Sequence, residues 1–287
     1  MNELVWKTAR RTLALGARTL VMGVLNVTPD SFSDGGQFFD RSRAVERAVQ
    51  MVEEGADLLD VGGESTRPGG ATVTVEEELR RVVPVVEAVA RKVSVPVSID
   101  TTKARVARAA LDAGAEIVND ISALRFEPRL ADEAARACAG LVLMHSRGTP
   151  EQLHTQEPSA DIWKDVCEGL RRSVEEATAR GVARECIALD PGIGFGKTQE
   201  QNVELLAHLP RFARELQGYP VLVGTSRKSF IGRILGGAPA GARLHGTMAT
   251  VTAAVLCGAH IVRVHDVAAA IETVRVADAL KAVMSDK

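Results

Sequence analysis

Polar and ionisable side chains follow short apolar runs at several points of this chain. Residues 58–61, LLDV, are followed by GGESTRPG at 62–69, which places Ser65, Thr66 and Arg67 directly after a predicted buried strand. An arginine beside two hydroxyls suits the binding of an oxyanion such as phosphate. A polar turn with a solvated arginine explains the same residues, so the interpretation depends on how the other apolar runs end.

Seven other apolar runs also end in residues that can do chemistry. A lone aspartate after a strand is usually a helix N-cap, and a lone asparagine is usually a turn residue. Repetition of the pattern along the whole chain is harder to explain by capping alone. The residues at these run ends include Asn26, Asp100, Asn119, Asp120, His145, Asp190, Lys228, Ser229, Arg263 and His265.

Four of these residues form a first predicted group, because their chemistry fits one kind of ligand. Asp100, Asn119 and Asp190 each follow an aliphatic or β-branched residue, and Lys228 follows the seventh run. Buried carboxylates need hydrogen-bond donors or partner charges. A flat heterocycle with several N–H groups supplies such donors, since an amino-pyrimidinone edge can form two parallel bonds to one carboxylate.

A second predicted group is cationic. Arg67, Arg263 and His265, with the hydroxyls of Ser65 and Thr66, suit a phosphate or a diphosphate. Asn26 offers an oxygen ligand for Mg²⁺, an ion that usually bridges phosphate oxygens with few protein ligands. The segment GIGFGKT at 192–198 lacks the spacing of a Walker motif, which argues against a nucleotide-binding P-loop.

The elements that must position these residues alternate along the chain. Each short apolar run is followed by a polar loop and then by a longer amphipathic segment, the pattern of a parallel sheet with helices between its strands. The apolar runs are residues 20–27, 58–61, 97–99, 117–118, 141–144, 187–189, 221–223 and 261–264. The helix-like segments are residues 41–54, 75–91, 103–113, 129–139, 162–180, 199–209, 246–257 and 267–284.

Eight such units predict an α/β fold of the (β/α)8 TIM-barrel class, whose ligand-binding residues lie where the strands end. Residues 4–20 precede the repeat and predict a short N-terminal hairpin or plug across the barrel floor. No Pro/Ser-rich linker interrupts the 287 residues, so we predict one domain over 1–287. An open doubly wound sheet is the structural alternative, with its ligand at one switch point.

Composition excludes several classes of protein. Aromatic residues make up 3% of the chain and the net charge is −2, which argues against nucleic-acid binding. No stretch approaches the roughly 20 apolar residues of a membrane span, and the N-terminus lacks a signal-peptide pattern. The four cysteines have no metal-ligand spacing. We therefore expect a cytoplasmic protein that does not bind a membrane.

Seven motifs resemble the dihydropteroate synthases, in matching order and spacing from about residue 20 to the last helix. They are MGVLNVTPDSFSDGG (22–36), LLDVGGESTRPG (58–69), SIDTT (98–102), IVNDIS (117–122), LDPGIGFGKT (189–198), LVGTSRKSF (222–230) and IVRVHD (261–266). The stand-alone bacterial form of this pterin-binding TIM-barrel family is the nearest match.

The resemblance implies a transferase of folate biosynthesis that condenses 6-hydroxymethyl-7,8-dihydropterin diphosphate with p-aminobenzoate. By the family pattern, Asp100, Asn119, Asp190 and Lys228 hold the pterin, and Arg263 stacks on its ring. Arg263, His265 and Asn26 contact the diphosphate or its Mg²⁺. A mobile loop carries Thr66 and Arg67, and the pocket for p-aminobenzoate, where sulfonamides compete, is lined by Phe32, Pro68, Phe195 and Ser229.

Within this resemblance, Asp100, Asp190, Lys228 and Arg67 are the expected catalytic residues. A homodimer is also implied, and the apolar faces of 246–257 or 267–284 offer an interface. Two alternatives remain at the level of sequence. A methyltetrahydrofolate:corrinoid-type methyltransferase shares the pterin pocket but does not need the loop with Thr66 and Arg67. A non-catalytic pterin-binding paralogue predicts the loss of an anion- or metal-binding residue.

Overall fold

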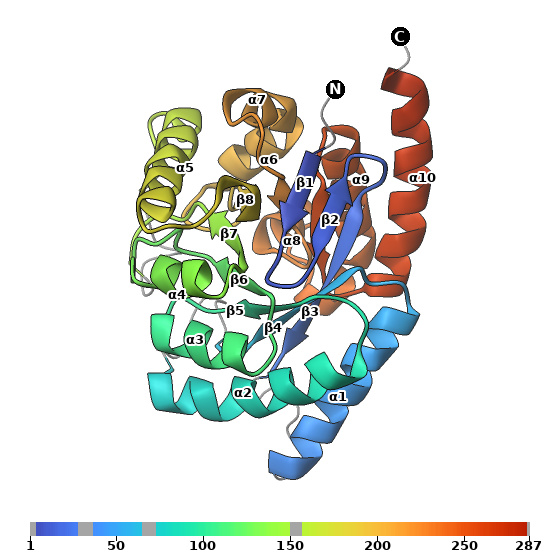
Figure 1. The fold of residues 1–287 in the computed structure, drawn as a ribbon. Helices are drawn as coiled ribbons and strands as arrows, with labels where there is room; N and C mark the ends of the chain where they lie inside the picture. Colours follow the sequence, from blue (N-terminus) through green and yellow to red (C-terminus); the bar gives the residue numbers. More distant parts are fainter. Residues whose placement is uncertain (1–3, 28–36, 65–72, 150–156, 286–287) are drawn as a thin grey trace.

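A parallel barrel forms the centre of the protein, as a computed structural model describes it for residues 4–27, 37–64, 73–149 and 157–285 (Figure 1). Its strands follow one another in the order β8-β7-β6-β5-β4-β3-β10-β9. Between the two end strands, Leu189 pairs with Val221, and the Leu189 N–H donates to the Pro220 carbonyl at 2.8 Å. The strands are β3 (Leu20–Asn26), β4 (Leu58–Gly62), β5 (Val97–Asp100), β6 (Ile117–Asp120), β7 (Gly140–Met144), β8 (Ile187–Asp190), β9 (Leu222–Val223) and β10 (Ile261–Val264).

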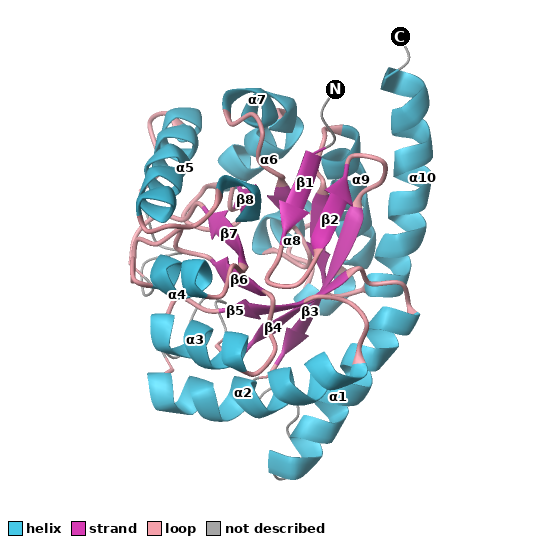
Figure 2. Ribbon diagram, viewed as in Figure 1, coloured by secondary structure: helices cyan, strands magenta, loops and turns pink. Residues whose placement is uncertain are grey.

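Helices surround the barrel, and each predicted helical segment is present with its ends shifted by a few residues (Figure 2). They are α1 (Gln37–Glu53), α2 (Val75–Lys92), α3 (Ala104–Asp112), α4 (Leu130–Arg136), α5 (Ile162–Ala179), α6 (Gln199–Ala207), α9 (Leu244–Leu256) and α10 (Val267–Ser285). Two short helices, α7 (Leu209–Glu215) and α8 (Ser229–Ile234), were not predicted. The predicted (β/α)8 fold is confirmed, and the open doubly wound alternative is wrong.

The predicted plug is an antiparallel hairpin of β1 (Leu4–Lys7) and β2 (Thr12–Leu15). Its Trp6 is fully buried and clusters with Met22, Leu58 and Ile117 at the starts of the barrel strands. The Trp6 indole donates a hydrogen bond to the Cys186 carbonyl at 2.8 Å. The hairpin therefore closes the end of the barrel opposite to the one where the functional residues gather.

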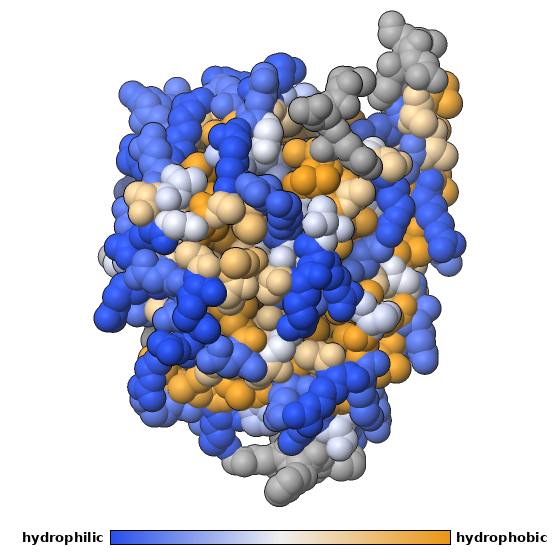
Figure 3. All heavy atoms as spheres, in the orientation of Figure 1, coloured by the Kyte–Doolittle hydropathy of each residue, from blue (hydrophilic) through white to orange (hydrophobic). Residues whose placement is uncertain are grey.

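Aliphatic residues supply almost the whole core, as the low aromatic content predicts. Strands β4, β6, β7 and β8 are buried along their entire length, which is the expected state of parallel strands covered on both faces. Among the described residues, no helix is long and apolar enough to cross a membrane. On the face drawn in Figure 3, hydrophilic side chains lie mainly around the periphery, while apolar ones appear in the centre, over α1 and α2, and along α10.

Candidate active site

An arginine joins two aspartates at the carboxyl end of the barrel. The Arg263 Nε donates to Asp60 Oδ2 at 2.6 Å, and its Nη2 donates to Asp100 Oδ2 at 2.7 Å. The side chains of Asp60, Asp100 and Arg263 are 0%, 15% and 22% exposed, so the pairs lie largely out of water. The sequence grouped Arg263 with the cationic residues, but the structure places it between the carboxylates, because β10 directs this residue into the barrel mouth.

Asn119 completes this half of the site. Its Nδ2 donates to Asp60 Oδ2 at 2.9 Å, so one carboxylate oxygen accepts from both Asn119 and Arg263. The other oxygen, Asp60 Oδ1, is buried without a hydrogen-bond partner among the described residues. A buried carboxylate oxygen in that condition is costly. It marks a position at which a bound ligand with an N–H group would be stabilised.

Sequence reasoning left Asp60 out of the site. It lies inside an apolar strand, Leu58–Gly62, rather than at its end, and it was treated as part of the strand. The available signal was chemical: a charged residue in the middle of a run buried on both faces needs a partner. Parallel pairing places Asp60 beside Ser98 on β5, two residues before the Gly62–Asp100 pair on both strands.

Asp190 and Lys228 form the opposite side of the mouth. Asp190 Oδ1 accepts a hydrogen bond from the Gly192 N–H at 2.6 Å. Lys228 Nζ donates to the Ile193 carbonyl and lies 4.5 Å from the centre of the Phe195 ring, within the range of a cation–π contact. The loop after β8 therefore holds the Lys228 ammonium against the barrel mouth.

Two glycines make this close packing possible. Gly192 and Gly194 have φ values of +69° and +89°, which L side chains rarely adopt. A Cβ at Gly192 would lie 1.7 Å from the His145 carbonyl oxygen, and one at Gly194 would lie 2.8 Å from Lys228 Cδ. The glycine-rich loop therefore shapes the site through its backbone and is not a phosphate-binding P-loop.

Burial changes the protonation equilibria of these groups. Burial raises the pKa of Asp100 to about 7, against the opposing attraction of Arg263. Burial also raises the pKa of Asp190, opposed by Lys228, and lowers the pKa of Lys228 to about 8, opposed by Asp190. For Arg263 the attraction of Asp60 and Asp100 outweighs burial, and its pKa is raised. The pKa values of Asp100 and Lys228 are thus brought close to neutral pH, a frequent property of functional sites.

A small apolar wall stands beside these charges. Ile121 and Met144 are buried together where β6 and β7 end, with Phe126 and Phe195 packed against them. A flat heteroaromatic ring fits between these two sides. Its polar edge would meet the carboxylates and the amide, and its face would lie against the apolar wall.

The remaining described residues of the predicted site lie around the same mouth. His265 is half-buried at the end of β10, with Nδ1 2.9 Å from Ser226 Oγ. Asn26 is the last residue of β3 and is half-buried. Its Oδ1 lies beside Gly62, 3.8 Å from the position that a Cβ would take there. Ser229 is exposed at the first position of α8.

Four predicted site residues, Phe32, Thr66, Arg67 and Pro68, lie outside the described residues. Only the stem of the segment that carries three of them is described. The Val73 N–H donates to Glu64 Oε1 at 3.2 Å, which joins the two sides of the stem.

A buried ion cluster holds that stem. Lys103 Nζ lies 2.5 Å from a carboxylate oxygen of Glu64 and 2.5 Å from one of Glu78. Glu78 is 1% exposed and Lys103 is 17% exposed. No sequence motif indicated this cluster, because Lys103, at the start of α3, belongs to the βα unit after the one that carries Glu64 and Glu78.

The site and the whole barrel are shared with known proteins. The sequence pattern of the family described as "Pterin binding enzyme" matches residues 22–265. A dihydropteroate synthase of Synechocystis sp. is 49% identical over 92% of this chain and 91% of its own length. This chain belongs to the dihydropteroate synthase family. The predicted family, a transferase family of stand-alone bacterial enzymes, is thereby confirmed.

Solved dihydropteroate synthases share the architecture as well. The Xanthomonas albilineans dihydropteroate synthase, solved with 4-aminobenzoic acid, is 43% identical with a TM-score of 0.90, and the match covers 98% of this chain and 99% of that one. The Burkholderia cenocepacia dihydropteroate synthase, solved with 7,8-dihydropteroate, is 43% identical with a TM-score of 0.88, and the match covers 99% of both chains.

Proposed function

We propose that this protein condenses 6-hydroxymethyl-7,8-dihydropterin diphosphate with p-aminobenzoate, giving 7,8-dihydropteroate and diphosphate in folate biosynthesis. The observation that carries this proposal is the group formed by the buried Asp60, Asn119 and Asp190 and the largely buried Asp100 at the barrel mouth, beside an apolar wall. These residues offer several acceptors to a ring that carries N–H donors on its edge. Ligands of this kind are present in the solved relatives.

The pterin would bind by replacing contacts that the residues of the site make with one another. Asp100 is held by Arg263 at 2.7 Å, and Asp60 has a buried oxygen without a partner among the described residues. The amino-pyrimidinone edge would donate to Asp190 and Asn119, and a ring N–H would donate to Asp100. Arg263 would then turn its planar guanidinium toward the ring face, where stacking and cation–π attraction are favourable.

The chemistry is the displacement of diphosphate by an arylamine. The bond from the pterin methylene carbon to the diphosphate oxygen breaks, diphosphate leaves with the electron pair, and the amine nitrogen bonds to that carbon and then loses a proton. Positive charge develops on the pterin as the diphosphate departs. Asp100 and Asp190, fixed before the charge appears, would stabilise it electrostatically. An arylamine attacking a cationic carbon needs no strong general base.

The leaving group requires cations at the mouth. We assign this role to Arg67 and His265, with Lys228 close to the reacting carbon. Asn26 fits Mg²⁺, because its amide oxygen stands at the mouth and this ion prefers oxygen ligands, few of them from protein when phosphate is present. When bound, Mg²⁺ would supply charge neutralisation to the diphosphate oxygens.

The second substrate would enter beside the pterin. Phe195, on the loop after β8, and Ser229, at the start of α8, flank Lys228. They are assigned to the p-aminobenzoate pocket, together with Phe32 and Pro68 by family resemblance. Thr66 is assigned to diphosphate binding with Arg67. Exclusion of water around this pocket would protect the cationic carbon from hydrolysis.

We further propose a homodimer in the cytoplasm. Large apolar residues are exposed along α10: Val276, Leu280, Val283 and Met284 are 64%, 53%, 67% and 63% exposed. An apolar stripe of this size on one helix favours a protein interface. The four cysteines are free thiols, which favours a reducing compartment. Light scattering of Leu280→Glu tests the dimer and should show a monomer.

Release of diphosphate tests the proposed reaction. The purified protein is mixed with the pterin diphosphate, p-aminobenzoate and Mg²⁺, and diphosphate and dihydropteroate are measured together. We expect equal amounts of the two products. Asp190→Asn should lower kcat/KM by about ten- to a hundredfold, the range for one charge-assisted hydrogen bond. Asp112→Asn, a surface change on α3, should leave it unaltered. Folded protein that releases no diphosphate would contradict the proposal.

A further inference from the structure

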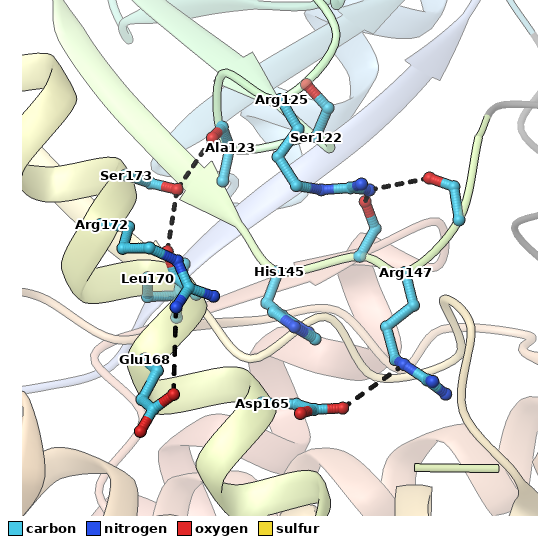
Figure 4. Close-up of a pocket in the computed structure, with 13 residues that line it drawn as sticks. Ser122, Ala123, Arg125, His145, Arg147, Asp165, Glu168, Leu170, Arg172 and Ser173 are labelled. Atoms are coloured by element: carbon cyan, nitrogen blue, oxygen red, sulfur yellow. Dashed lines mark hydrogen bonds and ion pairs between the residues drawn. The ribbon is translucent and has the colours of Figure 1, made fainter.

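A second cavity lies beside the barrel mouth and takes no part in the proposed reaction. It has a volume of about 330 Å³ and lies between the loops after β6 and β7 and the first half of α5. Figure 4 shows its polar lining, which comes from all three segments. Its charged or titratable lining residues are Arg125, His145, Arg147, Asp165, Glu168 and Arg172.

The three arginines are incompletely neutralised. Arg147 Nε lies 3.5 Å from Asp165 Oδ2, and Arg172 Nη1 lies 3.9 Å from Glu168 Oε2. Charge-assisted hydrogen bonds are normally about 2.7–2.9 Å long, so both pairs are loose. Arg125 Nη2 donates only to neutral oxygens, at 3.0 Å to Ser146 Oγ and at 3.0 Å to the Gly148 carbonyl. The lining therefore carries three arginines and two carboxylates, and the buried Asp120 attracts Arg125 from behind the lining.

His145 stands among these cations. It is 8% exposed, and its Nδ1 is buried without a hydrogen-bond partner among the described residues. Its ring extends from the end of β7 toward Asp165, into the space framed by Arg147 and Arg172 (Figure 4). Burial lowers its pKa well below 6.5, and Lys197, Arg125, Arg147 and Arg172 lower it further. The imidazole is therefore neutral and has an unmatched polar atom, a condition that a bound ligand would relieve.

The wall formed by the loop after β6 is held in a strained conformation. Ala123 and Leu124 have φ values of 48° and 67°, in the left-handed region that residues with a side chain rarely adopt. Asp120 holds the loop by accepting from the Ser122 N–H, the Ser122 hydroxyl and the Leu124 N–H. On the other side, the Ser173 hydroxyl of α5 donates to the Ala123 carbonyl at 2.8 Å. The wall that presents Arg125 is thus built from several mutually supporting contacts.

We propose that this cavity is a binding site for a small oxyanion, a phosphoryl group or a compact dicarboxylate. Guanidinium groups are the preferred partners of both, because their N–H pairs match two oxygens at once. The anion would draw Arg147 and Arg172 away from their loose carboxylate partners and would accept from the His145 ring. A volume of about 330 Å³ is ample for a ligand of this size.

The cavity shares a backbone wall with the proposed active site. Lys197 Nζ donates to the His145 carbonyl at 3.2 Å and to the Gly192 carbonyl at 2.8 Å. A Cβ at Gly196 would lie 2.6 Å from Arg147 Cβ. Since phosphate is also expected to enter the diphosphate subsite, a test must report on each site separately.

Two histidines supply separate reporters. His145 lines the cavity, and His265 belongs to the predicted diphosphate subsite. Orthophosphate and malonate are titrated in turn at constant ionic strength, and the imidazole resonances of both rings are followed by NMR. We expect orthophosphate or malonate to move the His145 resonances saturably and to raise the pKa of His145, since the anion offsets the surrounding positive charge. The anion that saturates the His145 response at the lower concentration identifies the class of ligand, a phosphoryl group for orthophosphate and a dicarboxylate for malonate.

Arg172→Ala is the decisive variant, because this side chain is 71% exposed and its removal should leave the fold intact. It should weaken binding at His145 by about tenfold, the effect of one charge-assisted hydrogen bond, and leave the His265 response unchanged. Arg171→Ala is the matched control, since Arg171 lies on the same helix and pairs with Glu215 instead.

Arg125→Met gives a second test from a different loop and should also weaken the His145 response. The proposal is wrong if neither anion moves the His145 resonances while phosphate moves those of His265. It is also wrong if Arg171→Ala weakens the response as much as Arg172→Ala does, because the effect would then be general charge.

Discussion

Replacement of Asp100 by asparagine should stabilise the empty protein at neutral pH while it impairs pterin binding. Burial raises the pKa of this carboxyl from 3.8 to about 7. The unfolded chain therefore releases the proton near pH 4 and the folded protein near pH 7. Between these values the folded state binds more protons, so its stability falls as pH rises, and the contribution of this group is gone above about pH 7.

The magnitude follows from the same two values. At about 1.36 kcal/mol for each pH unit, the interval from 3.8 to about 7 corresponds to about 4 kcal/mol. Asparagine resembles the protonated acid, so Asp100→Asn should match the parent within about 0.5 kcal/mol at acidic pH. Between pH 5 and pH 7.5 the difference in unfolding free energy between the variant and the parent should grow by about 2–3 kcal/mol in favour of the variant.

Urea denaturation at pH 5 and pH 7.5 measures this difference. Asp112→Asn is the control, since its side chain is 57% exposed on the surface of α3 and its effect should not depend on pH in this way. Pterin affinity, measured by calorimetry at pH 7.5, should fall by about ten- to a hundredfold for Asp100→Asn, because a charge-assisted acceptor is lost. A stability difference that is equal at both pH values would refute the buried-charge argument.

Four further outcomes are expected. kcat/KM should decline below about pH 7 as Asp100 is protonated and above about pH 8 as Lys228 loses its proton, and a pH–rate profile checks both limbs. Chelation of Mg²⁺ should reduce turnover by more than tenfold, whereas Asn26→Ala should raise the Mg²⁺ concentration needed for half-maximal rate. Lys103→Met should cost about 3 kcal/mol in urea denaturation, because two carboxylates lose their buried cation. Arg67→Ala should lower turnover but leave circular dichroism and pterin affinity largely unchanged.

Much of the fold could be predicted from the sequence, because its signals are local. The eight apolar runs alternate with amphipathic segments, and each became a strand or a helix at nearly the predicted place. Helices α7 and α8 were missed because they are short: Leu209–Glu215 and Ser229–Ile234 span only two turns each. Segments of this length carry too few residues for a periodic pattern to appear.

The site was predictable where a functional residue ends a strand. Asp100, Asn119 and Asp190 stand at such ends, and the barrel brings all strand ends to one face. Asp60 was missed because it lies within a strand, and the pairing of Arg263 with two acids was missed because β10 is far from β4 and β5 in sequence. Contacts of this kind depend on barrel closure, which no local pattern specifies.

The charges at the mouth also explain the hydrogen bonds that its residues make with one another. Asp60, Asp100 and Asp190 are buried close together, and such carboxylates would repel one another without a cation. Arg263 reduces this repulsion by donating hydrogen bonds to Asp60 and Asp100. Lys228 does the same for Asp190 by electrostatic attraction. A ligand that donates N–H groups to Asp100 and Asp190 can replace the hydrogen bond that Asp100 loses when Arg263 turns away, while Asn119 keeps its bond to Asp60. The guanidinium, which Asp60 and Asp100 otherwise hold, is thereby free to turn toward the ligand.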